Sequence, residues 1–278
     1  MQSIKGELKK LDLDKIRQRA NLLSSTNEVA AAAEPKRYRC NQCKDELGWL
    51  KRVQLSDKPF DYRDQWEDCP CTKERAIERL MKSSQISDRF RKKTLSNFVT
   101  DGAAAIVKEA YQAAVEYAES FEKIKDLPQN SAALLGQSGA GKTHLLMGVS
   151  NHLLKKGVAV FYFPYIEGFS ELKDNLDTAG TRLQKLKTAE VLFIDDLFKG
   201  GKKDKQTGIK MPSDWEVEKM IEVINHRYLE QKPTLISSER DIAALCDIDE
   251  ALGGRIHEMC KDYMVIIEGG MELNQRFR

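Results

Sequence analysis

The chain has 278 residues, of which 41% are hydrophobic and 32% charged, and its formal net charge is +2. This length exceeds the ~100–150 residues of a typical domain and predicts one large globular domain with a smaller attachment. The first residues run directly into alternating charges and no stretch approaches ~18 apolar residues, which argues against a secretory signal and a membrane span. We therefore expect a cytoplasmic protein without disulfides.

The first 37 residues predict a helix followed by a linker. Apolar residues recur among charges over residues 4–23, which indicates a modest amphipathic helix. The serine, threonine and alanine content of residues 24–35 is typical of a linker. We therefore expect residues 1–37 to precede the first folded module.

Two cysteine pairs follow the linker. Cys40 and Cys43 form a Cys-x-x-Cys, and Cys69 and Cys71 form a Cys-x-Cys 25 residues further on. Such spacing allows two short knuckles to meet at one tetrahedral zinc ion. A redox Cys-x-x-Cys is the alternative, but it leaves the second pair unexplained. We predict a zinc-binding module over residues 38–84, whose fold depends on the metal because it has few aliphatic residues.

Two segments of the chain are strongly basic. Residues 73–93, which include a predicted helix over residues 72–84, hold eight Lys or Arg against three acids, and residues 199–210 hold five Lys against one Asp. These segments could contact nucleic acid phosphates or an acidic partner, and a solvated surface is the alternative for each. A longer amphipathic helix is predicted over residues 102–121.

A complete P-loop follows this helix. Residues 136–143 read Gly-Gln-Ser-Gly-Ala-Gly-Lys-Thr between an apolar run, residues 132–135, and a helical pattern. Small residues let successive backbone N–H groups surround phosphates, Lys142 would reach the β- and γ-phosphates, and Thr143 would coordinate Mg²⁺. The sequence therefore predicts an ATP site. Its predicted members are Gly136, Gln137, Ser138, Gly139, Ala140, Gly141, Lys142, Thr143 and His144, although His144 could be an ordinary helix residue.

Further short apolar runs alternate with helical segments after the P-loop. They predict strands at residues 158–163, 191–194, 234–237 and 264–267. This alternation is typical of an α/β fold with a parallel sheet covered by helices on both faces. We assign residues 85–278 to this ATPase domain.

Two acids end the strand at residues 191–194. Asp195 would hold Mg²⁺ together with Thr143, and Asp196 would orient or deprotonate the attacking water. Capping of a following helix is the alternative for this pair.

Downstream of these acids, two further residues, Ser238 and Arg255, are candidates for catalysis. Ser238 ends a strand at a position suited to the γ-phosphate or the water, or else it caps a helix. Arg255 follows two glycines and could serve as an arginine finger for a neighbouring subunit, or could be a surface residue. The aromatic residues 161–163, together with the lysines of residues 199–210, could bind single-stranded DNA by stacking and phosphate contacts, or could belong to the core.

The ordered motifs resemble the AAA+ ATPases that load the replicative helicase in bacteria and phages, the DnaC/DnaI type. The resemblance covers residues 38 to the C-terminus. It rests on the two cysteine pairs, Ile86-Ser87-Asp88-Arg89-Phe90, Leu95-Ser96-Asn97-Phe98, Gly136 to His144, Ile194-Asp195-Asp196-Leu197, Ile224-Asn225-His226-Arg227-Tyr228, Ser237-Ser238-Glu239 and Gly254-Arg255.

This resemblance implies a function and its partners. It implies a P-loop strand at the centre of the sheet, a small N-terminal domain that grips the hexameric helicase, and an ATPase domain that binds single-stranded DNA and self-associates through Arg255. Residues 89–98 would lie against the adenine, and turnover would be slow and stimulated by partners. The short segment after the last predicted strand leaves no room for a full helical lid, which argues against a DnaA-type initiator.

Two other functions remain open at this point. An IstB-type transposition helper would have much the same AAA+ core, although the cysteine module favours the loader. A non-catalytic adaptor would bind ATP, hydrolyse little of it, and recognise its partners through the zinc module and the basic segments.

Overall fold

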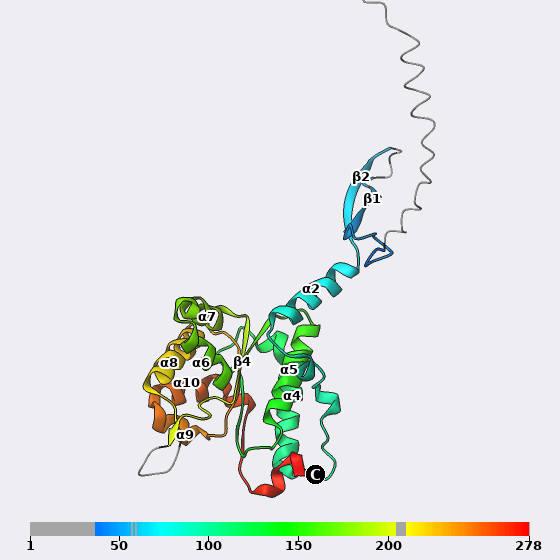
Figure 1. Cartoon of the computed structure of the whole chain (residues 1–278). Coiled ribbons are helices and arrows are strands. Elements are labelled where there is room, and N and C mark those ends of the chain that lie inside the picture. Colours follow the sequence, from blue (N-terminus) through cyan, green and yellow to red (C-terminus); the bar gives the residue numbers. More distant parts are fainter. Residues whose placement is uncertain (1–36, 57, 59, 204–209, 278) are drawn as a thin grey trace, which may run out of the picture. The chain divides into compact units, whose positions relative to one another are not determined.

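The computed structural model describes residues 37–56, 58, 60–203 and 210–277 (Figure 1). The predicted helix over residues 4–23 and the linker over residues 24–35 lie outside the described residues. The chain divides into two compact units, residues 1–69 and residues 70–278. Among the described residues, no helix is both long and apolar enough to cross a membrane. The domain boundaries predicted above stay predictions.

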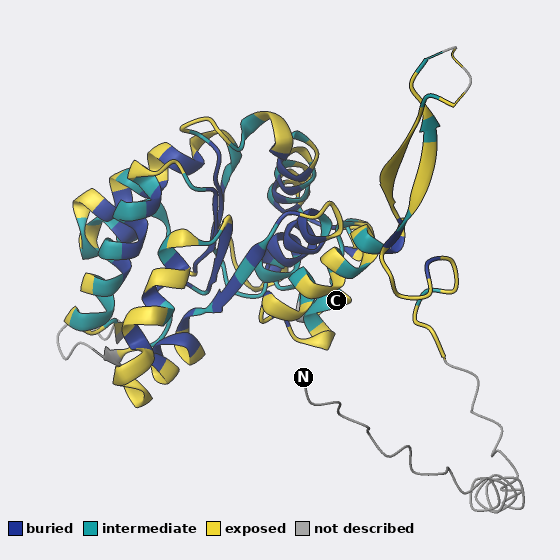
Figure 2. Ribbon diagram, turned by 90° about the horizontal axis from the view of Figure 1, so that it is seen from above, coloured by how far each residue is buried: buried dark blue, intermediate teal, exposed yellow. Residues whose placement is uncertain are grey.

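The described part of the first unit is built on a β-hairpin. Strand β1 (Gly48–Gln54) pairs antiparallel with β2 (Tyr62–Asp68), in a register that runs from Gly48 opposite Asp68 to Gln54 opposite Tyr62. Most of its side chains are exposed (Figure 2), including Phe60 at 91% and Trp66 at 52%. Because so little apolar surface is buried, the hydrophobic effect contributes little to the stability of the hairpin.

The second unit is an α/β domain. Its α-helices are α2 (Cys71–Ser83), α3 (Asp88–Arg91), α4 (Ala105–Ile124), α5 (Lys142–Lys155), α6 (Tyr165–Asp174), α7 (Leu176–Thr188), α8 (Asp214–Leu229), α9 (Ile242–Ile248) and α10 (Glu250–Cys260). Its strands are β3 (Ala132–Gly136), β4 (Val160–Pro164), β5 (Val191–Asp195), β6 (Lys202–Lys203), β7 (Lys210–Met211), β8 (Thr234–Ser237) and β9 (Met264–Ile267). Short 3-10 helices cover Leu95–Asn97, Lys261–Tyr263, Met271–Leu273 and Gln275–Phe277.

Five parallel strands form the sheet of this unit, in the order β4-β5-β8-β3-β9. The predicted strands and the parallel sheet are therefore confirmed. The expectation that the P-loop strand lies at the centre is wrong, because three strands lie on one side of β3 and only β9 lies on the other. Strand β8 takes the central place, and β3 remains an interior strand.

Helices cover both faces of the sheet (Figure 1). Alternate residues of β3 face opposite cores: Ala132 and Leu134 pack with α4 and α5, whereas Ala133 and Leu135 pack with α6 to α10. Such strands are buried on both faces, as Figure 2 shows, and read as continuous apolar runs. This explains why the strands were recognisable in the sequence.

The aromatic strand is part of the core, so stacking of DNA bases on it is not supported. Tyr162 and Phe163 of β4 are 6% and 0% exposed, and each packs in one of the two cores. The lysine-rich insert, residues 199–211, includes β6 and β7, which pair antiparallel. Residues 204–209 of the insert lie outside the described residues, and its DNA contacts stay a prediction.

Candidate nucleotide site and cysteine cluster

The P-loop connects β3 to α5 through left-handed glycines. Gly136 has a φ of 94° and Gly141 a φ of 96°. A Cβ at Gly136 would lie 2.4 Å from the carbonyl oxygen of Ile267, and one at Gly141 would lie 2.6 Å from Cε2 of Phe98. Only glycine satisfies both the backbone conformation and the close approach at these positions. Gly136 and Gly141 therefore allow the backbone conformation of the P-loop.

Lys142 is directed back into its own loop. Its Nζ donates to the carbonyl oxygens of Gly136 and Gln137, both at 2.7 Å, and the residue is only 5% exposed. Burial lowers the pKa of this ammonium to about 8. A buried ammonium is costly without a counter-charge, so an anionic phosphate is the ligand that this position favours.

Asp195 lies beside Thr143, at the start of α5. Its carboxylate accepts hydrogen bonds from the hydroxyl groups of Thr143 at 2.8 Å, Ser237 at 2.5 Å and Tyr162 at 3.0 Å. Burial raises the pKa of Asp195, and the hydrogen bonds from Ser237 and Thr143 oppose that shift. A carboxylate beside a threonine hydroxyl offers the oxygen ligands that Mg²⁺ prefers, so these residues fit the predicted metal.

Asp196 follows in a left-handed conformation, with a φ of 59°. Its backbone N–H donates to the Ser237 hydroxyl at 2.8 Å, and its carboxylate pairs with Lys199 at 3.0 Å. Ser237 therefore holds both acids at the end of β5. This residue was not among the predicted site residues.

Ser238 lies apart from this cluster. Its hydroxyl is buried and donates to the carbonyl oxygen of Leu197 at 2.8 Å. Adjacent residues of a strand face opposite sides of the sheet, so Ser237 and Ser238 cannot both point to Asp195. Alternation alone does not say which of the two serines takes which side, and the pairing of β5 with β8 decides it. The sensor role of Ser238 stays a prediction.

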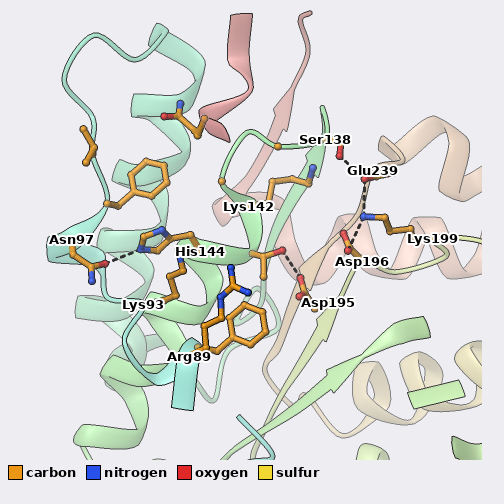
Figure 3. Close-up of a pocket in the computed structure, with 17 residues that line it drawn as sticks. Arg89, Lys93, Asn97, Ser138, Lys142, His144, Asp195, Asp196, Lys199 and Glu239 are labelled. Atoms are coloured by element: carbon orange, nitrogen blue, oxygen red, sulfur yellow. Dashed lines mark hydrogen bonds and ion pairs between the residues drawn. The ribbon is translucent and has the colours of Figure 1, made fainter. Parts of the chain in front are cut away.

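A cavity of about 640 Å³ adjoins the P-loop (Figure 3). Its wall includes side chains from residues 89–98, the segment for which the resemblance implies contact with adenine. Phe98 stacks on Tyr111, with ring centroids 5.9 Å apart, and meets the His144 ring edge-on at 5.2 Å. Nε2 of His144 lies 2.8 Å from Oδ1 of Asn97. The lining residues are Arg89, Phe90, Lys93, Asn97, Phe98, Val99, Ser138, Gly139, Gly141, Lys142, Thr143, His144, Asp195, Asp196, Lys199, Glu239 and Gln275.

Besides Val99, which directly follows the predicted adenine-contacting segment, three lining residues were not predicted to act in the site: Lys199, Glu239 and Gln275. Gln275 reaches the cavity because its backbone N–H donates to the carbonyl oxygen of Gly139 at 3.0 Å. Their separation in the sequence from the P-loop hid them, since only the folded sheet brings these segments together. Arg89 and Lys93 also line the cavity, so part of the basic segment faces this site.

Arg255 does not line this cavity. It is half-buried on α10, and its guanidinium carbon lies 5.9 Å from the centroid of the Tyr228 ring. An arginine finger acts on a neighbouring subunit's nucleotide, so this placement leaves the predicted role untested.

The four cysteines gather in one cluster. The Sγ atoms of Cys40, Cys43, Cys69 and Cys71 all lie within 4.8 Å of one another, and those of Cys40 and Cys69 are 3.7 Å apart. Four thiolates at ~2.3 Å from a tetrahedral zinc ion are about 3.8 Å from each other. Hydrogen bonds from the backbone N–H groups of Cys43 and Gln42 lower the pKa of Cys40 to about 7. The cluster is therefore compatible with zinc, whose ligand is the thiolate.

Comparison with known families identifies similar proteins. The model of the family described as IstB-like ATP binding protein matches residues 71–248. "Uncharacterized protein YqaM" of Bacillus subtilis (strain 168) is 49% identical over 230 residues, which cover 82% of this chain and 72% of YqaM. "Phage-like element PBSX protein XkdC" of the same organism is 44% identical over 248 residues, 88% of this chain and 89% of XkdC.

Two of the more distant matches are to helicase loaders. "Replicative helicase loader DnaI" of Bacillus subtilis (strain 168) is 33% identical over 110 residues, which cover 38% of this chain and 32% of DnaI. Among solved structures, "Crystal structure of the DnaC helicase loader" superposes with a TM-score of 0.53 and 21% identity, over 66% of this chain and 100% of that one. This second match concerns the fold alone.

Proposed function

The chain belongs to the family of IstB-like ATP binding proteins, and from this premise we propose that it is an ATP-dependent loader that binds the replicative DNA helicase and delivers it onto single-stranded DNA. The observation that carries the proposal is the presence, on one chain, of the nucleotide cavity and a zinc-compatible cysteine cluster. The partial identity with a protein named replicative helicase loader supports the same function.

We propose the following roles for the residues of the site. Backbone N–H groups of the P-loop and the Lys142 ammonium bind the β- and γ-phosphates of ATP, while Thr143 and Asp195 hold Mg²⁺. The metal, when bound, neutralises charge on the phosphates. Asp196 orients or deprotonates the water that attacks the γ-phosphorus, and Ser238 is a candidate sensor. Arg255 of a neighbouring subunit completes the site, so hydrolysis is slow until subunits or partners assemble.

The rest of the chain supplies recognition. The cysteine module, held by zinc, grips the hexameric helicase, and the ATPase unit binds single-stranded DNA and self-associates. Exposed basic residues of α2, such as Lys73 and Lys82, are candidates for the phosphate contacts. We propose that the protein acts in the cytoplasm, where the cysteines stay reduced and can bind the metal as thiolates.

Native mass spectrometry of the full chain tests the proposal. The protein is measured alone and with the replicative helicase of its own host, each with and without Mg·ATP. We expect one zinc per chain and a complex of defined stoichiometry with the helicase hexamer. Wild type is compared with Lys142→Ala, which should lose ATP-dependent changes in the complex but keep its zinc. A protein that binds nucleotide and ignores the helicase would refute the loader function.

The family model favours one alternative, a transposition helper ATPase of the IstB type. Duplex DNA binding separates the two, because a helper would bind duplex DNA tightly and would not need a helicase. A non-catalytic adaptor is distinguished by the same Lys142→Ala variant, which would then keep every binding activity.

A further inference from the structure

A chain of polar contacts joins the P-loop to the ends of two other strands (Figure 3). The Ser138 hydroxyl donates to Oε1 of Glu239 at 2.7 Å. Nζ of Lys199 lies 2.9 Å from the same oxygen and 3.0 Å from Oδ2 of Asp196. All four residues line the nucleotide cavity. Lys199 is thus the centre of a network in the wall of the nucleotide cavity, although the sequence marked it only as part of a basic segment.

The backbone holds Lys199 in a fixed place. The two residues before it, Leu197 and Phe198, are 0% and 1% exposed. The Leu197 N–H donates to the carbonyl oxygen of Ser237 at 2.8 Å, and Nε of Arg240 donates to that of Phe198 at 3.3 Å. These contacts tie the turn after β5 to the end of β8. The ammonium of Lys199 therefore extends from a rigid base, which is how ligand-binding groups are pre-organised.

The cavity wall holds the cations Arg89, Lys93 and Lys142 as well as Lys199, and Lys199 forms ion pairs with two of the wall's carboxylates. Asp195, Asp196 and Glu239 place three carboxylates in the wall, and the terminal phosphate of ATP would be repelled by them. The Mg²⁺ ion is expected at Asp195, which leaves the other two carboxylates to be balanced. Lys199 contacts both. An ammonium has three donors, and the carboxylates use two of them, so one N–H can contact a further anion.

We propose that Lys199 is a second phosphate-binding cation of this site, positioned by Asp196 and Glu239, and that it contacts the terminal phosphate of ATP. The proposal rests on the proposed function, since it requires ATP in the cavity. Lys142 would then contact the β-phosphate of both ATP and ADP, whereas Lys199 would contact a phosphate that only ATP has. The protein would distinguish ATP from ADP within one subunit, before any arginine finger arrives.

Equilibrium binding of a non-hydrolysable ATP analogue and of ADP, each with Mg²⁺, tests this proposal. We expect Lys199→Met to bind the triphosphate about tenfold more weakly, which corresponds to about 1.4 kcal/mol, and to keep its affinity for ADP. Lys199→Arg, which keeps the charge, should retain most of the triphosphate affinity. Equal losses for both nucleotides, or no loss for either, would overturn the proposal.

Lys219→Met is the matched control. Lys219 on α8 is likewise held by two carboxylates, those of Glu218 at 3.0 Å and Glu222 at 2.5 Å, but it does not line the cavity. The Lys219→Met variant should bind both nucleotides with the affinities of wild type. If Lys199→Met does not fold, Glu239→Gln is used instead, because it removes one of the two carboxylates that position Lys199. Glu239→Gln should selectively weaken binding of the triphosphate, by a smaller factor than Lys199→Met. If wild type binds neither nucleotide, the proposed function falls as well, whereas unaltered selectivity in a nucleotide-binding variant overturns only the role of Lys199.

Discussion

Replacing Ser237 by alanine tests how the two acids at the end of β5 are held. The Ser237 hydroxyl donates to Oδ1 of Asp195 and accepts from the backbone N–H of Asp196. A hydrogen bond to a charged group contributes about 1.5–3 kcal/mol, and about 1.4 kcal/mol changes a rate tenfold. If the loss appears mainly in the transition state, Ser237→Ala should lower kcat for Mg·ATP hydrolysis by about 10- to 100-fold.

The comparison variant is Ser238→Ala. The Ser238 hydroxyl contacts the backbone of Leu197 and Arg240 instead of the acids, so its loss should lower thermal stability and change kcat by about threefold at most. Steady-state hydrolysis is measured with single-stranded DNA and helicase present, because the basal rate is expected to be slow. Nucleotide binding is measured in parallel, to separate affinity from turnover. A larger loss of kcat in Ser238→Ala than in Ser237→Ala would refute this reasoning and favour the sensor role of Ser238.

Three further predictions concern the metal, the core and assembly. Cys69→Ser should release the zinc measured by metal analysis, whereas Cys246→Ser, outside the cluster, should keep it; equal zinc content in both would contradict the site. Arg227→Met should lower the free energy of unfolding, measured by chemical denaturation, by about 4 kcal/mol or more. The buried guanidinium donates to four backbone carbonyl groups, and each carbonyl left unsatisfied costs about 1–3 kcal/mol. A loss below ~1 kcal/mol would show that water molecules replace the guanidinium as hydrogen-bond donors. Arg255→Ala should bind ATP like wild type but lose hydrolysis, and mixing it with Lys142→Ala should restore activity in part; no restoration would argue against a finger in trans.

The fold could largely be predicted from local patterns. The five strands of the main sheet were recognised as apolar runs, because strands covered on both faces need apolar side chains at every position. The P-loop was recognised because its requirements are local: glycines with positive φ, a strand before and a helix after. The order of strands could not be read in this way, and the expectation of a central β3 failed for that reason.

The remaining site residues depended on pairing between distant segments. Ser138 and Glu239 are 101 positions apart, and Thr143 and Asp195 are 52 apart. Asp195 and Thr143 were nevertheless predicted, because each ends or follows a recognisable motif. Glu239 belongs to a motif of the resemblance, Lys199 to a basic segment and Tyr162 to an aromatic strand, but no pattern placed them in the nucleotide site. Their partners are set by which strands lie side by side and which face each side chain takes.

The sequence by itself thus determined the phosphate loop, the strand-end acids and the spacing of the cysteines, since each depends on neighbouring residues. Only the tertiary structure decided which hydroxyl reaches Asp195 and which cation lies beside Asp196. The physical reason is register. In a parallel sheet, the pairing of β5 with β8 places Ile194 opposite Ile236, and this alignment brings Ser237, and not Ser238, to the two acids.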